Sequence, residues 1–546
     1  MKGKPSCLNQ HQVVKWSLVF GSFKQPNFNY ILKINGVDQS IDTQSVQSND
    51  FGHHLAVTFD QEKNLWSISR SHLESELVYF SSANNRLVIS NDVVHMRLLA
   101  DVHQLNEKWL LNFFSFTDSY TYESPFKGIS ILPALGKMVV SCNGYEIKRH
   151  FLSENDINTE GAQEWSVDEW VKKWQSCNQQ AIASSSRQSD SIAIMLSSGL
   201  DSSGIAAYLK DQLKTSSQLK RVKGFSWSFP NNAKADETIY IQALVDHLGL
   251  DHEFIDIEDA HCFADIETWP VSIEAPYFNA MRRIKQILYQ AVSQQGFDVL
   301  FNGHIGDELC FVDRYVLAEL WRDNKSAWVK EFFNILTQTG LNIRYNNSFR
   351  YCVKQWFNIK DRGFSAPSSF SENATALFQK YDLGKTNSID MRPEQLGLLT
   401  ANSELLAIAT EHTFTNEHAI KRCQPYLNRD LIELALSCPA YFLSTHKQTK
   451  WISRQALSCL LPATLLNRSR VGQLDELFEQ GLDKNVDSIK EYLFRSDRRW
   501  PEYINEGAVN EVLDQQQWSK AASVIVPCLG FERWLDEWRS IDMPVL

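Results

Sequence analysis

LSSGLDSSG, residues 196–204, follows an apolar run at 191–195 and precedes a stretch whose apolar residues recur with helical spacing. This order predicts a strand, a tight turn of Gly and Ser, and a helix over 202–215. Backbone amides at such a turn and helix N-terminus bind anions, and a carboxylate at Asp201 suits Mg²⁺ that bridges phosphate oxygens. An ordinary helix cap is the alternative, because Ser and Asp are preferred N-cap residues.

A second motif of the same kind is FNGHIGDELC, residues 301–310. It follows another apolar run and places Gly303 and Gly306 beside an acidic pair that begins with Asp307. Two acidic turns at strand ends of one sheet face the same crevice. The two motifs together therefore predict a site for ATP and Mg²⁺, with Asp201 and Asp307 as ligands of one metal ion.

The segment around these motifs alternates strands with helices, which is typical of a doubly wound parallel sheet in an α/β domain. We expect helices at 166–186, 202–215, 235–250 and 279–296, and strands at 191–198, 222–229, 252–257 and 298–303. Before this segment, residues 12–150 predict short strands and turns, and a polar linker follows at 153–165. After it, residues 402–546 predict helices.

Composition predicts a soluble globular protein, with 43% hydrophobic and 22% charged residues over 546 positions. The net charge of −11 argues against nucleic acid as the main partner. Ten cysteines without a CxxC pair argue against zinc and indicate reduced, buried thiols. No apolar run approaches the roughly 18 residues of a membrane span, and no signal peptide is evident, so we expect a cytoplasmic protein.

Several motifs together resemble the asparagine synthetase family of PP-loop ATP pyrophosphatases. SSGLDSS resembles the SGGxDS loop of the superfamily, and NGHIGDE resembles the GxGGDE turn of the asparagine synthetase branch. Further segments resemble that branch in order along the chain: SPFKGISILPALGKMVV (124–140), ADETIYIQALVDHLGLDHEF (235–254), QPYLNRDLIELALSCP (424–439) and TKWISRQALSCLLPATLLNRSRVG (449–472).

The resemblance implies two domains. Residues 1–155 are expected to form a degenerate glutaminase-like layered β domain of the N-terminal-nucleophile (Ntn) type, and residues 166–546 a synthetase domain with helical additions and an insertion at about 316–400. It also implies that ATP activates a carboxylate as an acyl-adenylate, pyrophosphate leaves, and an amine attacks. Residues expected to bind the nucleotide, from the loop and its neighbouring strands, are Leu196, Ser197, Ser198, Gly199, Ser202, Ser203, Phe225 and Gly303.

Some positions depart from the family pattern. The chain begins Met1-Lys2-Gly3, without the catalytic cysteine of glutaminases, so we expect no ammonia release from glutamine. Ser198 stands where Gly is usual, at a cost if its φ is positive. Arg470 falls where many members have a catalytic lysine, and we assign it that role.

Lys421 stands where the family usually has an acidic residue, and Asn428 stands where it usually has an aspartate. Lys421 fits a solvated helix, as do Arg282, Arg283 and Lys285.

A synthetase domain without glutaminase resembles β-lactam synthetases and lasso peptide cyclases, whose attacking amine belongs to the substrate. About 120 residues separate Asp307 from PYLN, and this insertion and the closing CLGFERWL look more like the cyclases. The substrate is then a peptide, with a precursor peptide and a cysteine protease or leader-binding protein as possible partners. The alternatives are an asparagine-synthetase-like enzyme that uses ammonia or a partner's glutaminase, and an inactive ATP-binding homologue.

Overall fold

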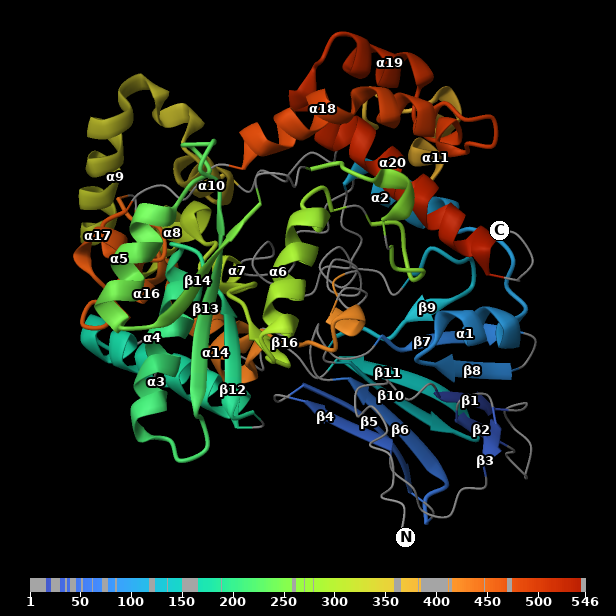
Figure 1. Ribbon diagram of the computed structural model, residues 1–546, viewed down its shortest axis with the longest axis horizontal. Coiled ribbons are helices and arrows are strands. Elements are labelled where there is room, and N and C mark those ends of the chain that lie inside the picture. The colour runs from blue at the N-terminus through green and yellow to red at the C-terminus, as the bar shows by residue number, and fades with distance from the viewer. Residues whose placement is uncertain are drawn as a thin grey trace.

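The computed structural model describes residues 16–20, 30–34, 37–39, 46–50, 53–60, 62–70, 77–83, 86–116, 123–134, 136–149, 165–187, 189–257, 262–269, 271–277, 279–357, 365–381, 383, 411, 415–445, 447–468 and 474–541. Its N-terminal part contains two antiparallel sheets, with strand orders β3-β2-β1-β8-β7-β9 and β11-β10-β6-β5-β4 (Figure 1). The strands are β1 Trp16–Phe20, β2 Tyr30–Ile34, β3 Val37–Gln39, β4 Val46–Asp50, β5 His53–Asp60, β6 Leu65–Arg70, β7 Tyr79–Ala83, β8 Arg86–Ser90, β9 Ser130–Ile131, β10 Gly136–Ser141 and β11 Gly144–Arg149.

The two antiparallel sheets pack on each other through alternate side chains. Trp16, Leu18 and Phe20 of β1 are buried in one apolar cluster with Trp66 and Ile68 of β6. The rings of Phe20 and Trp66 meet edge to face, with centroids 6.1 Å apart. Because side chains alternate between the two faces of a strand, each sheet contributes one face to this core. The layered β domain predicted from the sequence is confirmed.

Two helices correct the expectation that residues 12–150 contain only strands and turns. They are α1 (Val93–Ala100) and α2 (Glu107–Ser115). Asp92 caps α1 by accepting the His95 N–H, and Asn106 caps α2 by accepting the Trp109 N–H. Helices of eight or nine residues span little more than two turns, so their apolar periodicity is a weak signal, and their stability comes from packing.

The second part of the chain is built on a five-stranded sheet with order β14-β13-β12-β15-β16, in which every adjacent pair is parallel. Its strands are β12 Ser191–Met195, β13 Arg221–Ser228, β14 Asp251–Asp256, β15 Val299–Phe301 and β16 Lys421–Cys423. Helix α3 (Val167–Ser186) precedes the sheet, and α4 (Leu200–Thr215), α5 (Thr238–Leu248) and α6 (Arg282–Gln294) connect its strands. The predicted α/β architecture is confirmed.

The strand order reverses at β12. The chain passes from β12 outward to β13 and β14, then returns to place β15 on the opposite side of β12. In open α/β sheets, ligands bind beyond the carboxyl ends of the strands at such a reversal. The two motifs follow β12 and β15, so the topology brings them to this crevice.

Strand β16 corrects the expectation that residues 402–546 are helical and that Lys421 lies on a solvated helix. Lys421 is paired with Val299, and Cys423 with Phe301, in parallel register. Three residues cannot display an alternating pattern that sequence periodicity would detect. The strand forms because it pairs with the edge of β15, and this pairing depends on the tertiary structure.

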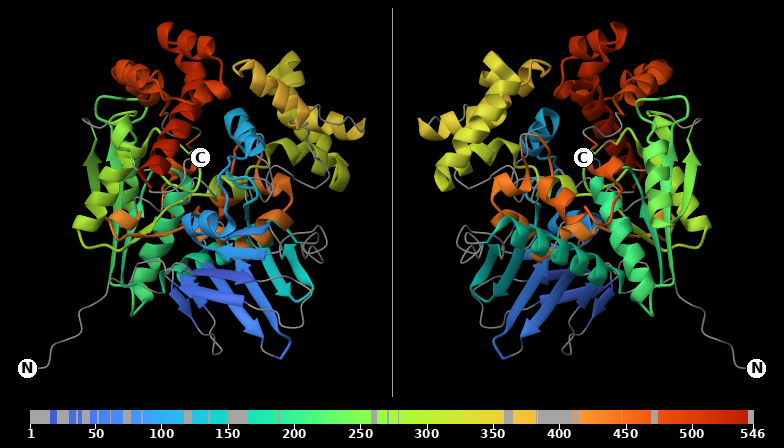
Figure 2. Two further views of the ribbon diagram at one scale, coloured as in Figure 1. Left: turned by 90° about the vertical axis from the view of Figure 1, so that its right-hand side faces the viewer. Right: turned by 90° about the vertical axis from the view of Figure 1, so that its left-hand side faces the viewer.

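The remaining described helices surround the parallel sheet or extend from it. They are α7 Gly306–Leu309, α8 Val316–Asp323, α9 Lys325–Thr339, α10 Asn347–Trp356, α11 Glu372–Lys380, α14 Arg429–Ser437, α15 Ala440–Leu443, α16 Trp451–Ala456, α17 Ala463–Leu466, α18 Asp475–Leu493, α19 Glu506–Asp514 and α20 Trp518–Ser540. Helices α8–α10 belong to the predicted insertion and share a small core of Leu317, Ile335 and Cys352. Figure 2 shows the yellow part of the chain projecting from the rest of the molecule.

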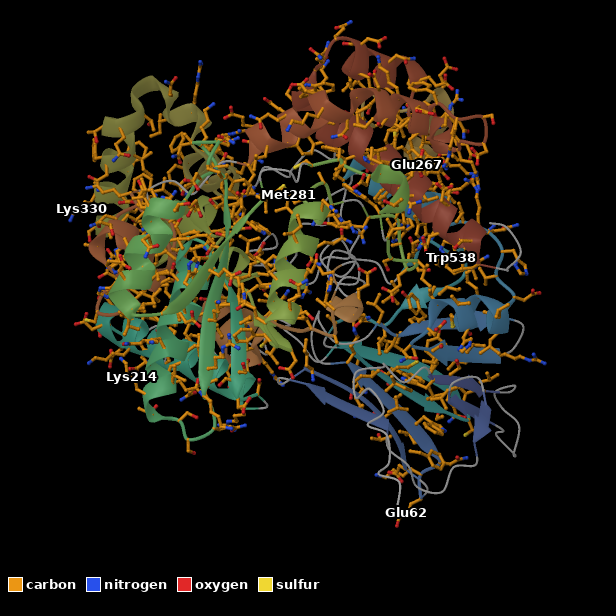
Figure 3. All side chains as sticks on the ribbon, in the orientation of Figure 1. Glu62, Lys214, Glu267, Met281, Lys330 and Trp538 are labelled. Atoms are coloured by element: carbon orange, nitrogen blue, oxygen red, sulfur yellow. The ribbon has the colours of Figure 1, made fainter. Side chains whose placement is uncertain are left out.

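The long helix α20 packs the C-terminal end of the chain against the β domain. Arg97 of α1 lies over the ring of Trp538, a residue labelled in Figure 3, at 4.3 Å from the ring centroid. Phe114 of α2 meets the Phe531 ring at 5.4 Å. Aromatic contacts of this kind bury large apolar areas. The two parts of the chain therefore share an apolar core.

We expect Glu532→Gln to lower the free energy of unfolding by about 3 kcal/mol, because Glu532 is a fully buried charge with several partners. It accepts the N–H groups of Arg499 at 2.7 Å and Trp500 at 2.8 Å, and pairs with Arg495 at 2.9 Å. Urea unfolding followed by tryptophan fluorescence measures the effect. Glu537→Gln, a partly exposed control on the same helix, should cost less than about 1 kcal/mol. Equal losses in the two variants would contradict the assignment.

Among the described residues, no helix combines the length and apolarity that crossing a membrane requires. The cysteines in this part of the chain are free thiols, and most are at least partly buried. Cys142 and Cys459 are exposed, which corrects the expectation of buried thiols at these two positions.

Candidate active site

The turn between β12 and α4 is held by its own serine side chains. Ser202 Oγ accepts the Ser197 N–H at 3.1 Å, and Ser197 Oγ accepts the Gly199 N–H at 3.2 Å. The first backbone bond of α4 runs from the Ser203 N–H to the Gly199 carbonyl. The amides of the first turn before Ser203 therefore point out of the helix N-terminus, where they attract an anion.

The second motif packs directly on the start of α4. A Cβ added at Gly306 would lie 2.5 Å from Asp201 Cγ, and one added at Gly303 would lie 2.9 Å from the Ser202 nitrogen. Both positions therefore require glycine. Between them Ile305, which is 1% exposed, has a φ of 69°. A β-branched residue is strained in that region, and burial of its side chain holds it there.

Lys450 joins the two motifs. Its Nζ lies 2.6 Å from Asp307 Oδ1 and also contacts Asp201 Oδ2. Burial, which alone disfavours the ammonium, is outweighed by the two carboxylates, so the pKa of Lys450 lies above its ordinary value. Burial raises the pKa of Asp201, and Lys450 offsets part of that effect.

The same geometry tests whether the site fits Mg²⁺. Both carboxylates reach one cationic atom, so their oxygens lie close enough to share a cation. Within the described residues, no group of three or more His, Cys, Asp or Glu forms a complete metal cage. Mg²⁺ in nucleotide sites is usually held by one or two carboxylates together with phosphate oxygens, so Asp201 and Asp307 fit it.

These groups line one cavity of about 480 Å³. A cavity of this size is typical of small-molecule sites. Of the residues predicted from the sequence, the cavity brings together Leu196, Ser197, Ser198, Gly199, Asp201, Ser202, Phe225, Gly303 and Asp307. His304 and Lys450 also line it.

One predicted residue, Ser203, is placed differently. Ser203 is fully buried, is not part of the cavity lining, and directs its hydroxyl to the Ser197 carbonyl at 3.4 Å. Arg470 lies outside the described residues, as do Met1, Lys2 and Gly3 at the start of the chain.

The contacts of Ser198 explain why this position can be a serine although the family pattern has glycine there. It is not among the described residues with positive φ, so its Cβ brings no backbone strain. Its N–H donates to Glu237 Oε2 at 3.1 Å, and Arg468 Nη1 donates to its hydroxyl. Arg468 also pairs with Glu237 at 3.1 Å and lies over the Tyr240 ring at 4.0 Å. The hydroxyl that replaces the expected glycine thus ties the loop to Arg468.

Sequence reasoning missed Lys450, Glu237 and Arg468 as residues of the site. All three lie in segments that carried the family resemblance, which was the available signal. Their partners cannot be read from the sequence, because Lys450 and Asp201 are 249 positions apart and Arg468 and Ser198 are 270 apart.

We expect Glu237→Ala to weaken MgATP binding about tenfold, because the Ser198 amide and Arg468 would lose a charged partner that fixes the loop. Isothermal titration calorimetry with MgATP measures the change. Asp246→Asn, at an exposed position on α5, the helix that Glu237 precedes, should leave the affinity within about twofold. An unchanged affinity in Glu237→Ala would show that the loop holds its shape without this contact.

Helix α6 corrects the expectation of a solvated basic face. Arg282 is 1% exposed, and Lys285 lines the cavity and pairs with buried Glu411. Only Arg283 of the three is exposed. The sequence indicated a solvated face because basic residues near a helix end are usually exposed, whereas here Glu411 supplies a counter-charge from 126 residues away.

Residues 174–536 match the protein family described as asparagine synthase, and the chain belongs to that family. The family and the fold together support an ATP-using ligase that forms amide bonds. The resemblance drawn from the motifs is thereby confirmed at the level of the family.

Other similarities are more limited. Over 127 residues the chain is 28% identical to Amidase chyE of Penicillium rubens and 27% identical to Amidase chry2 of Gibberella zeae. Each match covers 21% of this chain and 19% of the relative, so the chain spans about a fifth of the length of these curated relatives. A solved structure of the U34-tRNA thiolase NcsA from Methanococcus maripaludis matches 46% of this chain and 79% of its own, at 10% identity and a TM-score of 0.19.

Proposed function

We propose that this chain adenylates a carboxylate with ATP and transfers the acyl group to an amine, and that its substrate is a peptide whose own amine closes a macrolactam ring. The observation that carries the adenylation step is the meeting of Asp201, Asp307 and Lys450 beside the phosphate-binding loop in one cavity. The long insertion and the CLGFERWL segment, which resemble lasso peptide cyclases, support the choice of a peptide.

In the first step, a carboxylate oxygen of the substrate attacks the α-phosphorus of ATP. The bond from that phosphorus to the bridging oxygen of pyrophosphate breaks, which gives an acyl-adenylate. The amides at the start of α4 and the Lys450 ammonium are placed to hold the phosphates that leave. Asp201 and Asp307 would hold Mg²⁺, which neutralises charge on the leaving pyrophosphate when bound.

In the second step, the amine nitrogen attacks the acyl carbon, AMP leaves with the bonding electrons, and the amine loses a proton. Arg470 keeps the role that the resemblance implies for it, which is stabilisation of the charge on the adenylate. The walls of the cavity, including Phe225 and Leu196, shield the acyl-adenylate from water. In a peptide that carries both groups, the amine is already held near the acyl carbon.

The test is ATP–pyrophosphate exchange with purified protein and a panel of carboxylates. Peptides with a free N-terminal amine and an internal Asp or Glu should support exchange and yield a product lighter by one water, detected by mass spectrometry. Exchange with aspartate and ammonia, together with asparagine formation, would instead establish an asparagine-synthetase-like activity. Binding of MgATP without exchange on any carboxylate would point to an inactive homologue.

A further inference from the structure

The closing segment CLGFERWL and the residues that follow it lie on α20, and three of their side chains bind the backbone of a distant segment. Trp534 Nε1 donates to the Ile273 carbonyl at 2.9 Å, and Trp538 Nε1 donates to the same carbonyl at 2.8 Å. Arg533 Nη2 donates to the Trp269 carbonyl at 2.6 Å. Two indole N–H groups about one helical turn apart therefore converge on a single backbone oxygen.

The segment that accepts these bonds, residues 271–277, forms neither helix nor strand. Buried backbone groups outside regular structure need other partners. Val271 is 5% exposed and Ala275 is 2% exposed, so much of this segment lies inside the protein. The bonds from α20 therefore help to fix the path of a segment that no helix or sheet holds.

The 271–277 segment leads directly to the wall of the active-site cavity. Tyr277 and Asn279 line that cavity. Asn279 Oδ1 also accepts the Met281 N–H at 3.0 Å, which fixes the residue immediately before α6. Figure 3 labels Met281 at this point and Trp538 on α20. Helix α6 supplies three further lining residues, which are Lys285, Leu288 and Tyr289. The path of the segment therefore affects a substantial part of the wall.

The β domain packs against the same two tryptophans. The ring of Phe126 lies 5.5 Å from the ring of Trp534 and 5.2 Å from the ring of Trp538, measured between centroids. Phe126 and Arg97, whose guanidinium lies over the Trp538 ring, are both 0% exposed. Packed aromatic rings have little freedom to rotate, so the two indole N–H groups keep their direction. A continuous series of contacts thus joins the β domain, α20 and the cavity wall.

We propose that α20 is a positioning element of the active site. Trp534 and Trp538, which the β domain fixes, hold the 271–277 segment in the path that brings Tyr277 and Asn279 to the cavity. The β domain then contributes to nucleotide binding, although none of the described residues that line the cavity belongs to it. The inference rests on the proposed function in one respect, because it takes the cavity as the ATP site.

The test removes the indole N–H groups and leaves an aromatic ring at each position. In Trp534→Phe or Trp538→Phe alone, the Ile273 carbonyl keeps one donor, so the MgATP affinity measured by calorimetry should stay within about threefold of wild type. In the double variant the carbonyl loses both donors, and the affinity should fall about thirtyfold or more. A double variant whose loss equals the product of the two single losses would contradict a shared role for the two donors.

Trp518→Phe is the matched control on α20, because Trp518 Nε1 also donates a hydrogen bond, to Asp483 Oδ1 at 2.7 Å. This variant should leave the MgATP affinity within about twofold of wild type. Hydrogen–deuterium exchange at the amides of residues 271–277 is the second measurement. It should be about tenfold faster in the double variant and unchanged in the control.

Arg533→Gln gives a further variant in case the double variant does not fold. It removes the bond to the Trp269 carbonyl and leaves both indole rings in place. We expect faster hydrogen exchange at residues 271–277 and an MgATP affinity about threefold lower than in the wild type.

Two results would overturn the proposal. One is unchanged hydrogen exchange at residues 271–277 in the double variant, or in Arg533→Gln where that variant replaces it. The other is a loss of MgATP affinity no greater than in Trp518→Phe. Wild-type protein that binds no MgATP would instead overturn the proposed function, and hydrogen exchange would still decide whether α20 holds the segment.

Discussion

Asp201→Asn should lower ATP–pyrophosphate exchange by about a hundredfold to a thousandfold. The side chain of Asp201 lies in the first turn of α4, contacts Lys450, and faces the same cation position as Asp307. The amide of asparagine carries no charge to hold Mg²⁺ or the Lys450 ammonium. Removing one group that stabilises charge in a transition state typically lowers the reaction rate by a factor of roughly 100 to 1000. The measurement is isotope exchange at saturating substrate.

The matched control for this variant is Asp211→Asn, because Asp211 lies on the same helix and its side chain is 54% exposed. It should leave exchange unchanged. Thermal unfolding of both variants separates a loss of chemistry from a loss of fold. Exchange in Asp201→Asn within tenfold of wild type, with the fold intact, would remove Asp201 from the mechanism.

Gly306→Ala should lower exchange by about a hundredfold or more. The added Cβ would lie 2.5 Å from Asp201 Cγ and 2.6 Å from its Oδ1, so the Asp201 carboxylate must move. A displacement of about 1 Å in a catalytic group is enough to cost roughly two orders of magnitude in rate. We therefore expect a larger effect on exchange than on stability.

Gly507→Ala offers the same substitution in the first turn of another helix, α19. There the nearest atom is Asn505 Oδ1, which caps α19 by accepting the Ala508 N–H. Losing a cap costs about 1 kcal/mol of stability, and this variant should retain exchange. If Gly306→Ala keeps full exchange, the turn has room that the close approach to Asp201 does not indicate, and the requirement for glycine at 306 would be wrong.

The predicted elements of the α/β domain lie close to those in the structure. The strand expected at 191–198 is β12, and the helix expected at 202–215 is α4, which begins two residues earlier. These segments could be predicted from the sequence because long apolar runs, glycine turns and helical spacing are patterns among neighbouring residues. The short elements α1, α2 and β16 were missed, because their stability depends on packing and pairing with neighbours.

The residues of the candidate site also fall into those that could be predicted from the sequence and those that could not. Its loop and its two aspartates could be predicted, because each lies in a short motif directly after a strand. Lys450, Glu237, Arg468 and Glu411 could not be predicted, since each acts through a partner that is 39 to 270 positions distant. The charge of a lysine or glutamate is evident in the sequence, but its partner is set only by folding.

The sequence by itself thus predicted the turn at 196–204 as a loop for phosphate, paired Asp201 with Asp307, and determined the alternation of strands and helices that places both motifs at one edge of a sheet. Only the tertiary structure decided that Lys450 lies between the two aspartates and that the hydroxyl of Ser198 is bound by Arg468. The physical reason is the separation along the chain of the residues that interact. Strand, turn and helix formation depend on residues within a few positions, whereas charge neutralisation in a buried cavity depends on which distant segments the chain packs together.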